Sequence, residues 1–180
     1  YEHFMLKEIY EQPKTINDTI SPRIKDNDIV IEELNMSDEE IKEITKIHIV
    51  ACGSAYHTGV TAKYVIEGLA RIPVEVDVAS EFRYRDPILQ KGNMVIVISQ
   101  SGETADTLAA LRESRERGFK VLGIVNVVGS SIAREADNVF YTLAGPEIAV
   151  ATTKAYSTQL IACYALAVQF ALVREEISKE

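Results

Sequence analysis

The stretch from Met94 to Thr104 constrains the fold of this chain more than any other. Five apolar residues, most of them β-branched, occupy positions 94–98. Such an uninterrupted apolar run is typical of a strand that is buried on both faces of a parallel sheet. Hydroxyl residues gather around Gly102 directly afterwards, and a helical pattern begins at once over 106–117. The sequence therefore predicts a buried strand that ends in a polar loop at the start of a helix.

The polar loop has the composition of an anion site. Ser99, Gln100, Ser101 and Thr104 surround Gly102. Backbone N–H groups in the first turn of a helix are unpaired, and the helix dipole is positive there. A helix cap is worth about 1 kcal/mol and accounts for only one of these residues. We therefore predict a pocket for a phosphorylated small molecule. The loop lacks the lysine of a Walker loop, which argues against a nucleoside triphosphate.

The segments around this strand alternate between strand-like and helix-like patterns. Helical patterns cover 56–71 and 104–117, and a long final helix is expected to start near Thr152 or Thr153. Apolar and acidic residues alternate over 74–78, which predicts an exposed edge strand. The pattern as a whole predicts a three-layer α/β/α sandwich with a five-stranded parallel sheet and right-handed crossovers. The expected strands are 47–52, 74–78, 94–99, 121–125 and 139–142.

Two further polar segments follow predicted strands, at the sheet edge where ligands of such folds bind. Gly53 allows a tight turn and Ser54 supplies a hydroxyl at a helix start, although an ordinary strand–turn–helix with a serine cap has the same pattern. The segment 144–154 is long for a connection in this architecture. Either Glu147 or backbone groups of this segment meet sugar hydroxyls, or Thr152 or Thr153 simply caps the last helix.

We expect residues 1–45 to form a helical segment that leads into a domain at 46–180. Apolar residues recur at helical spacing near the start of the chain, and Pro13 is expected to end that helix or to start the next. Ser37 and Glu40 have the spacing of a capping box, which predicts a second, short helix.

Charge and hydropathy exclude two classes of partner. The net charge is −8, and eight acidic residues but only one lysine lie within 26–43. This distribution does not resemble the basic footprint of a nucleic-acid-binding protein. Residues 155–173 carry no charge and are long enough to span a bilayer, but polar residues interrupt them. We interpret this segment as a helix buried in the protein or in a subunit interface.

The cysteines and histidines point to no metal or disulfide framework. Cys52 and Cys163 both lie in apolar contexts, which favours buried thiols in a reducing compartment. The three histidines, His3, His48 and His57, are scattered along the chain. No dinucleotide-binding glycine motif is found either. We therefore expect a cytoplasmic protein without a cofactor.

Several motifs resemble, in order along the chain, those of the sugar isomerase (SIS) domain. They are most similar to the first SIS domain of the glutamine–fructose-6-phosphate aminotransferase family, and the resemblance covers essentially the whole chain. The matching segments are 5–13, 52–54, 79–84, 99–107 and 147–154.

The resemblance implies a flavodoxin-like SIS fold and a homodimeric enzyme that makes glucosamine 6-phosphate from fructose 6-phosphate and glutamine. It implies that this chain binds fructose 6-phosphate or glucosamine 6-phosphate. The substrate-binding positions carried over from the family are Gly53, Ser54, Ala55, Ser99, Gln100, Ser101, Thr104, Val150 and Thr152.

The resemblance also implies that parts of the family's machinery lie outside this sequence. These are a glutaminase domain, a second SIS domain with the acid–base glutamate, and a tail with a Schiff-base lysine. The positions carried over offer no group that titrates near neutral pH, so we expect a sugar-phosphate half-site that is inactive alone. The family often has a second hydroxyl residue after the one that matches Ser54. This chain has Ala55 there, which puts one side-chain contact to the ligand in doubt.

Two other functions fit the same fold. A regulatory SIS domain that senses sugar phosphates would be favoured by a basic helix-turn-helix before residue 45, but that region is acidic. A flavodoxin-like nucleotide or flavin module would favour aromatic residues around the ring, and the chain has no tryptophan.

Overall fold

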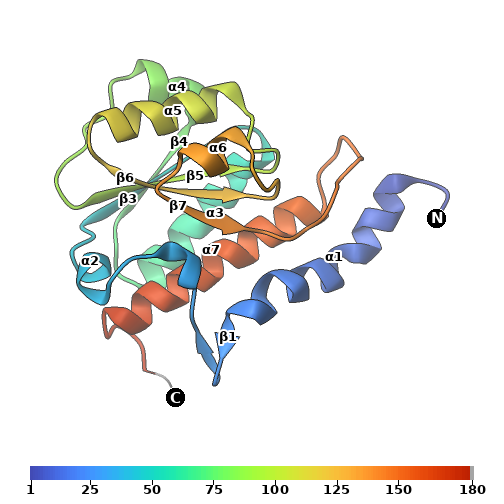
Figure 1. Ribbon diagram of the computed structural model, residues 1–180, viewed down its shortest axis with the longest axis horizontal. Coiled ribbons are helices and arrows are strands. Elements are labelled where there is room, and N and C mark those ends of the chain that lie inside the picture. Colours follow the sequence, from blue (N-terminus) through green and yellow to red (C-terminus); the bar gives the residue numbers. More distant parts are fainter. Residues whose placement is uncertain (179–180) are drawn as a thin grey trace.

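A five-stranded parallel sheet forms the middle layer of the molecule, as expected (Figure 1). The structure, a computed structural model, describes residues 1–178. The spatial order β4-β3-β5-β6-β7 places β4 at one edge, which confirms the predicted edge strand. Strand order reverses between β3 and β5, and the switch point therefore lies between them. The strands are β3 (Lys46–Ala51), β4 (Val74–Val78), β5 (Asn93–Ser99), β6 (Lys120–Val125) and β7 (Asn138–Tyr141).

Helices cover both faces of this sheet, and the residues of β5 alternate between the two cores. Ile96 and Ile98 pack with the helices α3 (Ser54–Leu69) and α7 (Lys154–Val173). Val95 and Val97 belong to a second cluster, under the helices of the opposite face. Both faces of the strand are buried, and this explains the uninterrupted apolar run. The opposite face carries α4 (Ala79–Tyr84), α5 (Ala105–Glu116) and α6 (Ser131–Glu135).

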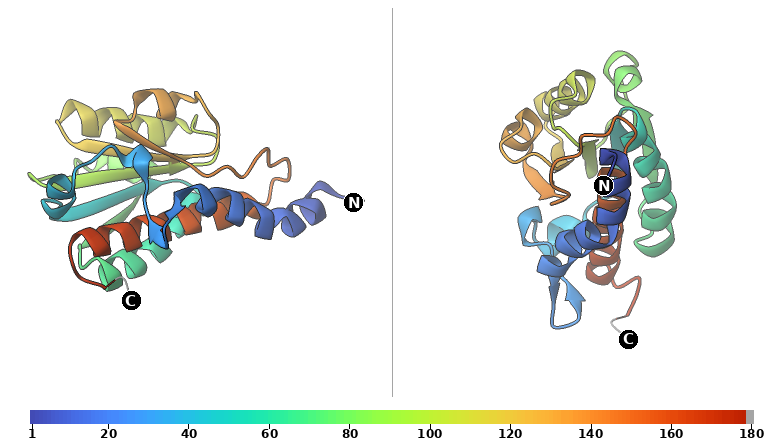
Figure 2. Two further views of the ribbon diagram at one scale, coloured as in Figure 1. Left: turned by 60° about the horizontal axis from the view of Figure 1, so that its bottom comes forward. Right: turned by 90° about the vertical axis from the view of Figure 1, so that its right-hand side faces the viewer.

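The N-terminal part of the chain contains two helices and a small hairpin. The helix α1 (Phe4–Ile20) lies along α7 (Figures 1 and 2). In α2 (Asp38–Lys42), Glu40 N–H donates to Ser37 Oγ at 3.2 Å and Ser37 N–H donates to Glu40 Oε2 at 2.8 Å, which confirms the predicted capping box. The hairpin was not expected from the sequence. Its elements and the flanking 3-10 helices are η1 (Ser21–Arg23), β1 (Ile24–Lys25), β2 (Asp28–Ile29) and η2 (Glu32–Leu34).

The buried Arg23 fastens this N-terminal part to the edge of the sheet. Its guanidinium lies 3.7 Å from the centroid of the Phe140 ring in β7. It also donates to the Tyr141 carbonyl at 3.0 Å and pairs with Glu33 at 2.6 Å. Arginine suits such a site because its planar group can stack and hydrogen-bond at once.

The expectation that Pro13 ends the first helix is wrong, because α1 continues through it to Ile20. Proline in a helix interior leaves the carbonyl four residues earlier without its N–H donor. Here that carbonyl belongs to Ile9, and the Gln12 side-chain amide donates to it at 3.2 Å. A neighbouring side chain thus replaces the missing backbone hydrogen bond.

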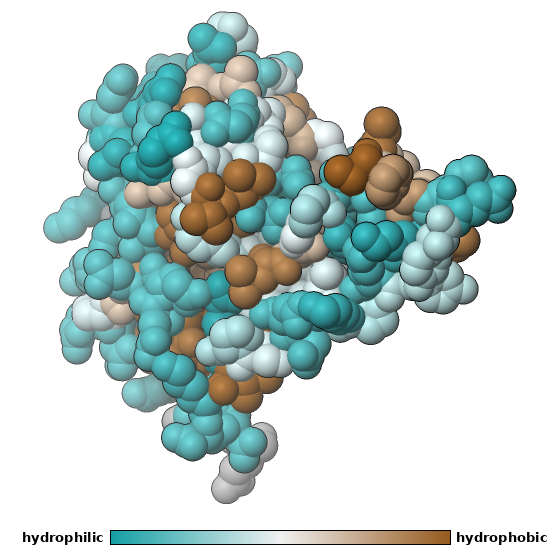
Figure 3. Space-filling view, turned by 45° about the vertical axis from the view of Figure 1, so that its right-hand side comes forward, coloured by the Kyte–Doolittle hydropathy of each residue, from teal (hydrophilic) through white to brown (hydrophobic). Residues whose placement is uncertain are grey.

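The long uncharged segment forms the core helix α7, which is also long and apolar enough to cross a membrane by length and composition alone. It packs between α1 and α3, and half of its most apolar window is buried. Half of the apolar surface of this segment is therefore used inside the chain. Exposed apolar side chains occur on α1 and on the loop after β7 (Figure 3), and also on other elements, as at Ile88 and Val128. On the first two elements there are several. They include Phe4, Met5, Ile9, Tyr10, Ile148 and Val150.

Shortening a core side chain of α7 is expected to destabilise the whole domain. Leu166 is fully buried, so Leu166→Ala should lower the free energy of unfolding by about 2 to 5 kcal/mol through lost burial and a residual cavity. Urea unfolding followed by circular dichroism measures this change. Leu6→Ala is the matched control, because Leu6 is 43% exposed and its truncation should stay within about 0.5 kcal/mol. Equal effects of the two variants would contradict the packing of α7 described above.

Candidate functional site

Residues 99–104, which we call the hydroxyl loop, join β5 to α5 at the carboxyl edge of the sheet. Ser99 Oγ lies 2.9 Å from Thr104 Oγ1 and accepts the Gly102 N–H at 3.1 Å. Ser101 Oγ accepts the Glu103 N–H at 3.2 Å. These hydrogen bonds within the loop hold its conformation. The loop leads directly into the first turn of α5. The N–H groups of that turn have no partner within the helix and face the carboxyl edge.

Only glycine fits at the centre of the hydroxyl loop. Gly102 has φ +67°, and a Cβ built on it would lie 2.0 Å from Ser130 Oγ and 2.5 Å from Ser130 Cβ. The Gly102 carbonyl accepts the Ile132 N–H at 3.0 Å. The loop therefore lies directly against the start of α6, and a side chain at position 102 would push the two apart.

The turn after β3 reaches the same edge beside the hydroxyl loop. In the parallel register Ala51 pairs with Ile98, and neighbouring strands are about 5 Å apart. Gly53, at φ +59°, turns the chain into α3, where Ser54 is exposed at the first position. The N-termini of α3 and α5 thus flank the switch point between β3 and β5. Two helix dipoles and their unpaired N–H groups favour negative charge there.

Ala55 occupies a core position and not the mouth of this site. It is 7% exposed and belongs to the hydrophobic cluster beneath α3 and α7. A hydroxyl at this position would be buried together with the Cβ. Ala55 therefore offers a ligand only its backbone N–H, in the unpaired first turn of α3.

The loop 142–153 after β7 is organised by a carboxylate. Glu147 Oε1 accepts the Thr152 hydroxyl at 2.8 Å, and Oε2 accepts the backbone N–H groups of Thr153 at 3.1 Å and Ala155 at 3.0 Å. Glu147 therefore caps α7. The expectation that Thr152 or Thr153 caps this helix is wrong: Thr153 makes no capping bond with its side chain, and the Thr152 hydroxyl donates to Glu147. The side chain of Val150 is fully exposed near the middle of the loop.

Asn126 joins this loop to the hydroxyl loop, and the sequence analysis missed it. Its backbone N–H donates to the Gln100 carbonyl at 3.1 Å. Its side chain donates to the Gly145 carbonyl at 2.8 Å and accepts the Ala144 N–H at 2.8 Å. A polar residue directly after the strand 121–125 was the available signal. It lies at the same sheet edge as the predicted site.

The carboxylate of Glu103, the acidic residue of the hydroxyl loop, is bound to the N-terminus of another helix. Glu103 Oε1 accepts the Ser131 N–H at 2.7 Å, at the N-terminus of α6. Hydrogen bonds from Ser131 lower the pKa of Glu103 below its usual value. The carboxylate is therefore ionised and held by α6, and an incoming anion at the N-terminus of α5 meets neutral donors first.

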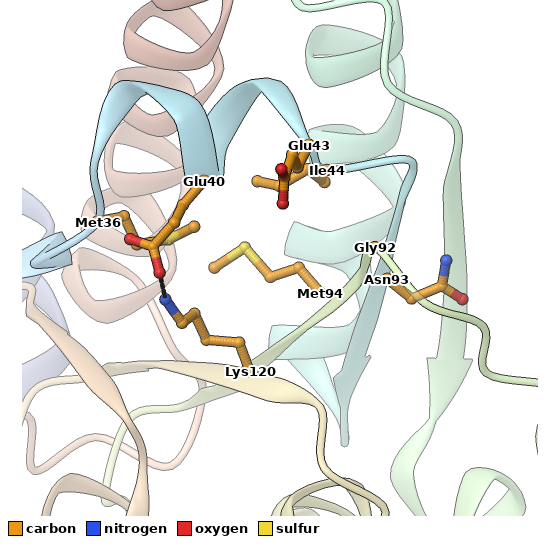
Figure 4. A pocket seen from close by; sticks show the side chains of 8 residues that line it. All are labelled: Met36, Glu40, Glu43, Ile44, Gly92, Asn93, Met94 and Lys120. Atoms are coloured by element: carbon orange, nitrogen blue, oxygen red, sulfur yellow. Dashed lines mark hydrogen bonds and ion pairs between the residues drawn. The ribbon is translucent and has the colours of Figure 1, made fainter.

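A small hollow of about 160 Å³ lies at the opposite end of the sheet (Figure 4). The thioether side chains of Met36 and Met94 approach each other inside it, and the ion pair between Lys120 and Glu40 closes one side. Its lining includes the first residues of β5 and β6. It is therefore separated from the hydroxyl loop by the length of the strands.

One cluster has the residue types of a metal site. His48, Glu75 and Asp77 lie together on β3 and β4, with their ligand atoms within 4.8 Å of one another. Both carboxylates already pair with cations: Lys46 binds Glu75, and Arg85 binds Glu75 and Asp77. Burial lowers the pKa of His48, so the imidazole is neutral and the cluster is balanced in charge. A divalent cation would add two uncompensated positive charges, and we therefore interpret the cluster as an ion-pair network on the edge strand.

The geometry defines a class of protein: an α/β domain with two helix N-termini at the switch point of a parallel sheet, an arrangement that favours negative charge. Residues 40–169 match the SIS domain family. This chain belongs to the SIS domain family.

Its relatives are more specific. It is 61% identical, over all of its length, to a glutamine–fructose-6-phosphate aminotransferase (isomerizing) of Clostridium tetani. It is 63% identical, over 99% of its length, to the enzyme of the same name from Caldanaerobacter subterraneus. The chain spans about 30% of the length of these relatives.

A solved structure shows the same fold. The chain matches the C-terminal domain of glucosamine-fructose-6-phosphate aminotransferase from Francisella tularensis with a TM-score of 0.94 and 44% identity. The match covers 99% of this chain and 50% of that one. The predicted three-layer SIS fold and the predicted resemblance are thereby confirmed.

Gly102→Ala is expected to destabilise the hydroxyl loop. The backbone strain at positive φ and the clash with Ser130 should together lower the free energy of unfolding by at least about 2 kcal/mol. Urea unfolding measures the loss. Adding Ser130→Gly removes the clashing atoms and should restore part of the stability.

Gly68→Ala serves as the matched control for this substitution. Gly68 is an exposed residue of α3, and a Cβ there would meet nothing within 4 Å. The change should be neutral or should stabilise the helix by up to about 1 kcal/mol. If Gly102→Ala behaved like Gly68→Ala, the close contact between the hydroxyl loop and α6 would be wrong.

Proposed function

We propose that this chain is the sugar-phosphate-binding part of a glutamine–fructose-6-phosphate aminotransferase. The observation that carries the proposal is the hydroxyl loop at the switch point, where Ser99, Ser101 and Thr104 meet the N-terminus of α5. Hydroxyl and backbone N–H donors with a helix dipole suit a phosphate group. The identity of 61% and 63% to aminotransferases of that name supports fructose 6-phosphate or glucosamine 6-phosphate as ligand.

The site is built to bind and not to move protons. The proposed ligand-binding residues come from the turn after β3, the hydroxyl loop and the loop after β7. They are Gly53, Ser54, Ala55, Ser99, Gln100, Ser101, Thr104, Val150 and Thr152. None of them titrates near neutral pH, whereas sugar isomerisation needs a general acid and base within hydrogen-bond reach of the carbon skeleton. We therefore expect the chain to bind sugar phosphate without turning it over.

This chain matches about 30% of the length of its relatives. In the proposal, the other reaction steps of the aminotransferase are carried out by the parts outside this match. In this proposal, residues 1–45 lead from a glutaminase domain into the SIS domain at 46–180. A second SIS domain would supply the acid–base glutamate. Release of ammonia from glutamine and the isomerisation itself would both require these parts.

We also propose that the protein is cytoplasmic and assembles as a homodimer. Cys52 and Cys163 are free thiols, and burial raises the pKa of Cys163 to about 12, which keeps it unreactive. Free buried thiols are typical of reducing compartments. The apolar side chains exposed on α1 and on the loop after β7 support an interface in which α1 takes part.

Calorimetric titration with fructose 6-phosphate and glucosamine 6-phosphate tests the binding function. Saturable binding is expected for both, and none for unphosphorylated fructose. Ser101→Leu should abolish binding, because it puts an apolar side chain in the hydroxyl loop and removes a donor. Ser21→Leu, at the end of α1, is the matched control and should bind normally. Binding that survives Ser101→Leu would place the ligand elsewhere, and the absence of binding at millimolar ligand would contradict the proposal.

Sedimentation equilibrium tests the interface. The chain is expected to dimerise in the micromolar range, and Phe4→Lys with Tyr10→Lys should shift it to monomer, because both side chains are more than half exposed on α1. Tyr64→Lys, on exposed α3, should leave the dimer unchanged. If the substitutions on α1 left the dimer unchanged, this helix would be ruled out as the interface.

A further inference from the structure

Three polar side chains of α1 reach the segment that follows β7. Glu8, Glu11 and Gln12 are spaced three and four residues apart, so they share one face of the helix. They belong to the motif at 5–13 that the sequence analysis singled out, and the binding function proposed above gives them no role. We call this set the α1 clamp.

Glu8 holds the middle of the loop. Its carboxylate is 2% exposed and accepts the Ile148 N–H at 2.6 Å and the Ala149 N–H at 3.3 Å. Buried carboxylates are costly unless hydrogen bonds satisfy them. Here the backbone of an irregular loop supplies those bonds. The carboxylate therefore fixes two consecutive peptide groups that no helix or strand would otherwise hold.

Glu11 and Gln12 hold the end of the loop and the start of α7. The Lys154 ammonium, whose side chain is 5% exposed, pairs with Glu11 Oε2 at 2.7 Å. The Ser157 hydroxyl donates to the Gln12 side-chain oxygen. Both contacts lie on the turn of α7 that Glu147 caps. Glu11 and Gln12 thus fix the end of the loop at the start of α7.

The other end of the loop is fixed to the hydroxyl loop. Asn126 binds Gly145 and Ala144 through its side chain and the Gln100 carbonyl through its N–H. The segment with Val150 and Thr152 is therefore held between Asn126 on one side and α1 on the other. Figure 2 shows this loop running out from the sheet alongside α1.

We propose that Glu8, with Glu11 and Gln12, positions the loop 142–153 for sugar-phosphate binding. This inference rests on the proposed function. Glu8 is a positioning residue, because it contacts the loop and not the hydroxyl loop. Removing its carboxylate leaves the Ile148 and Ala149 N–H groups without acceptors and lets the loop leave the binding arrangement. The apparent Kd rises as the fraction of molecules with the loop in its binding conformation falls, in inverse proportion to that fraction.

Hydrogen exchange with mass spectrometry, on the 180-residue chain, tests the clamp directly. Glu8→Ala should speed amide exchange at 148–155 by about tenfold or more, and leave exchange in β5 unchanged. Glu8→Gln keeps one acceptor oxygen and should fall between Glu8→Ala and the unaltered chain. Unchanged exchange at 148–155 in Glu8→Ala would overturn the clamp.

Titration with fructose 6-phosphate tests the consequence for binding. The Kd should rise by about threefold or more in Glu8→Ala, and less in Glu8→Gln. Glu116→Ala, on the exposed end of α5, and Ile66→Val, a core truncation in α3, should leave the Kd unchanged. The second control lowers stability without touching the loop, so it separates positioning from general destabilisation.

The two readouts separate the inference from the proposed function. Faster exchange with an unchanged Kd in Glu8→Ala would overturn the positioning role. An unaltered chain that binds no sugar phosphate would contradict the proposed function. The exchange data alone would then show whether Glu8 holds the loop in place.

Discussion

The burial of β5 on both faces is the constraint on which the rest of the structure depends. Its odd and even residues enter two separate cores, so helices must cover the sheet on both sides. Right-handed crossovers then bring every strand to the same edge, and each helix that follows a strand starts there. The switch point lies between β3 and β5, and the unpaired N–H groups of α3 and α5 meet beside it. Two helix N-termini that favour negative charge therefore follow from covering both faces of this sheet with helices.

Local polar contacts then shape this edge of the sheet. Gly102 lets the hydroxyl loop lie against Ser130, and Glu103 turns its charge toward α6. The loop is left with neutral donors, which suit the phosphate group of the proposed ligand. In the proposed function, the same neutrality limits the domain to binding, because proton transfer requires a titratable group.

The helix α1 links the beginning of the chain to this site. It lies along α7, and Glu8 and Glu11 hold the loop between β7 and α7. Arg23 secures the next segment to β7 through Phe140 and Tyr141. The N-terminal segment is therefore packed against the elements that shape the site. A change in α1 is transmitted to the loop after β7 through a few buried polar bonds.

The sequence by itself determined the strands, the parallel sheet, the capping box and the hydroxyl loop, because each depends on local periodicity or on residues close in the chain. It did not show that α1 passes through Pro13, since a Gln12 amide bound to Ile9 supplies the missing hydrogen bond. It could not assign Glu147 to the cap of α7 or find Asn126 and Glu8, whose partners lie across turns or far along the chain. Only the tertiary structure brings such groups together. A hydrogen bond depends on distance in space, and a sequence pattern records only distance along the chain.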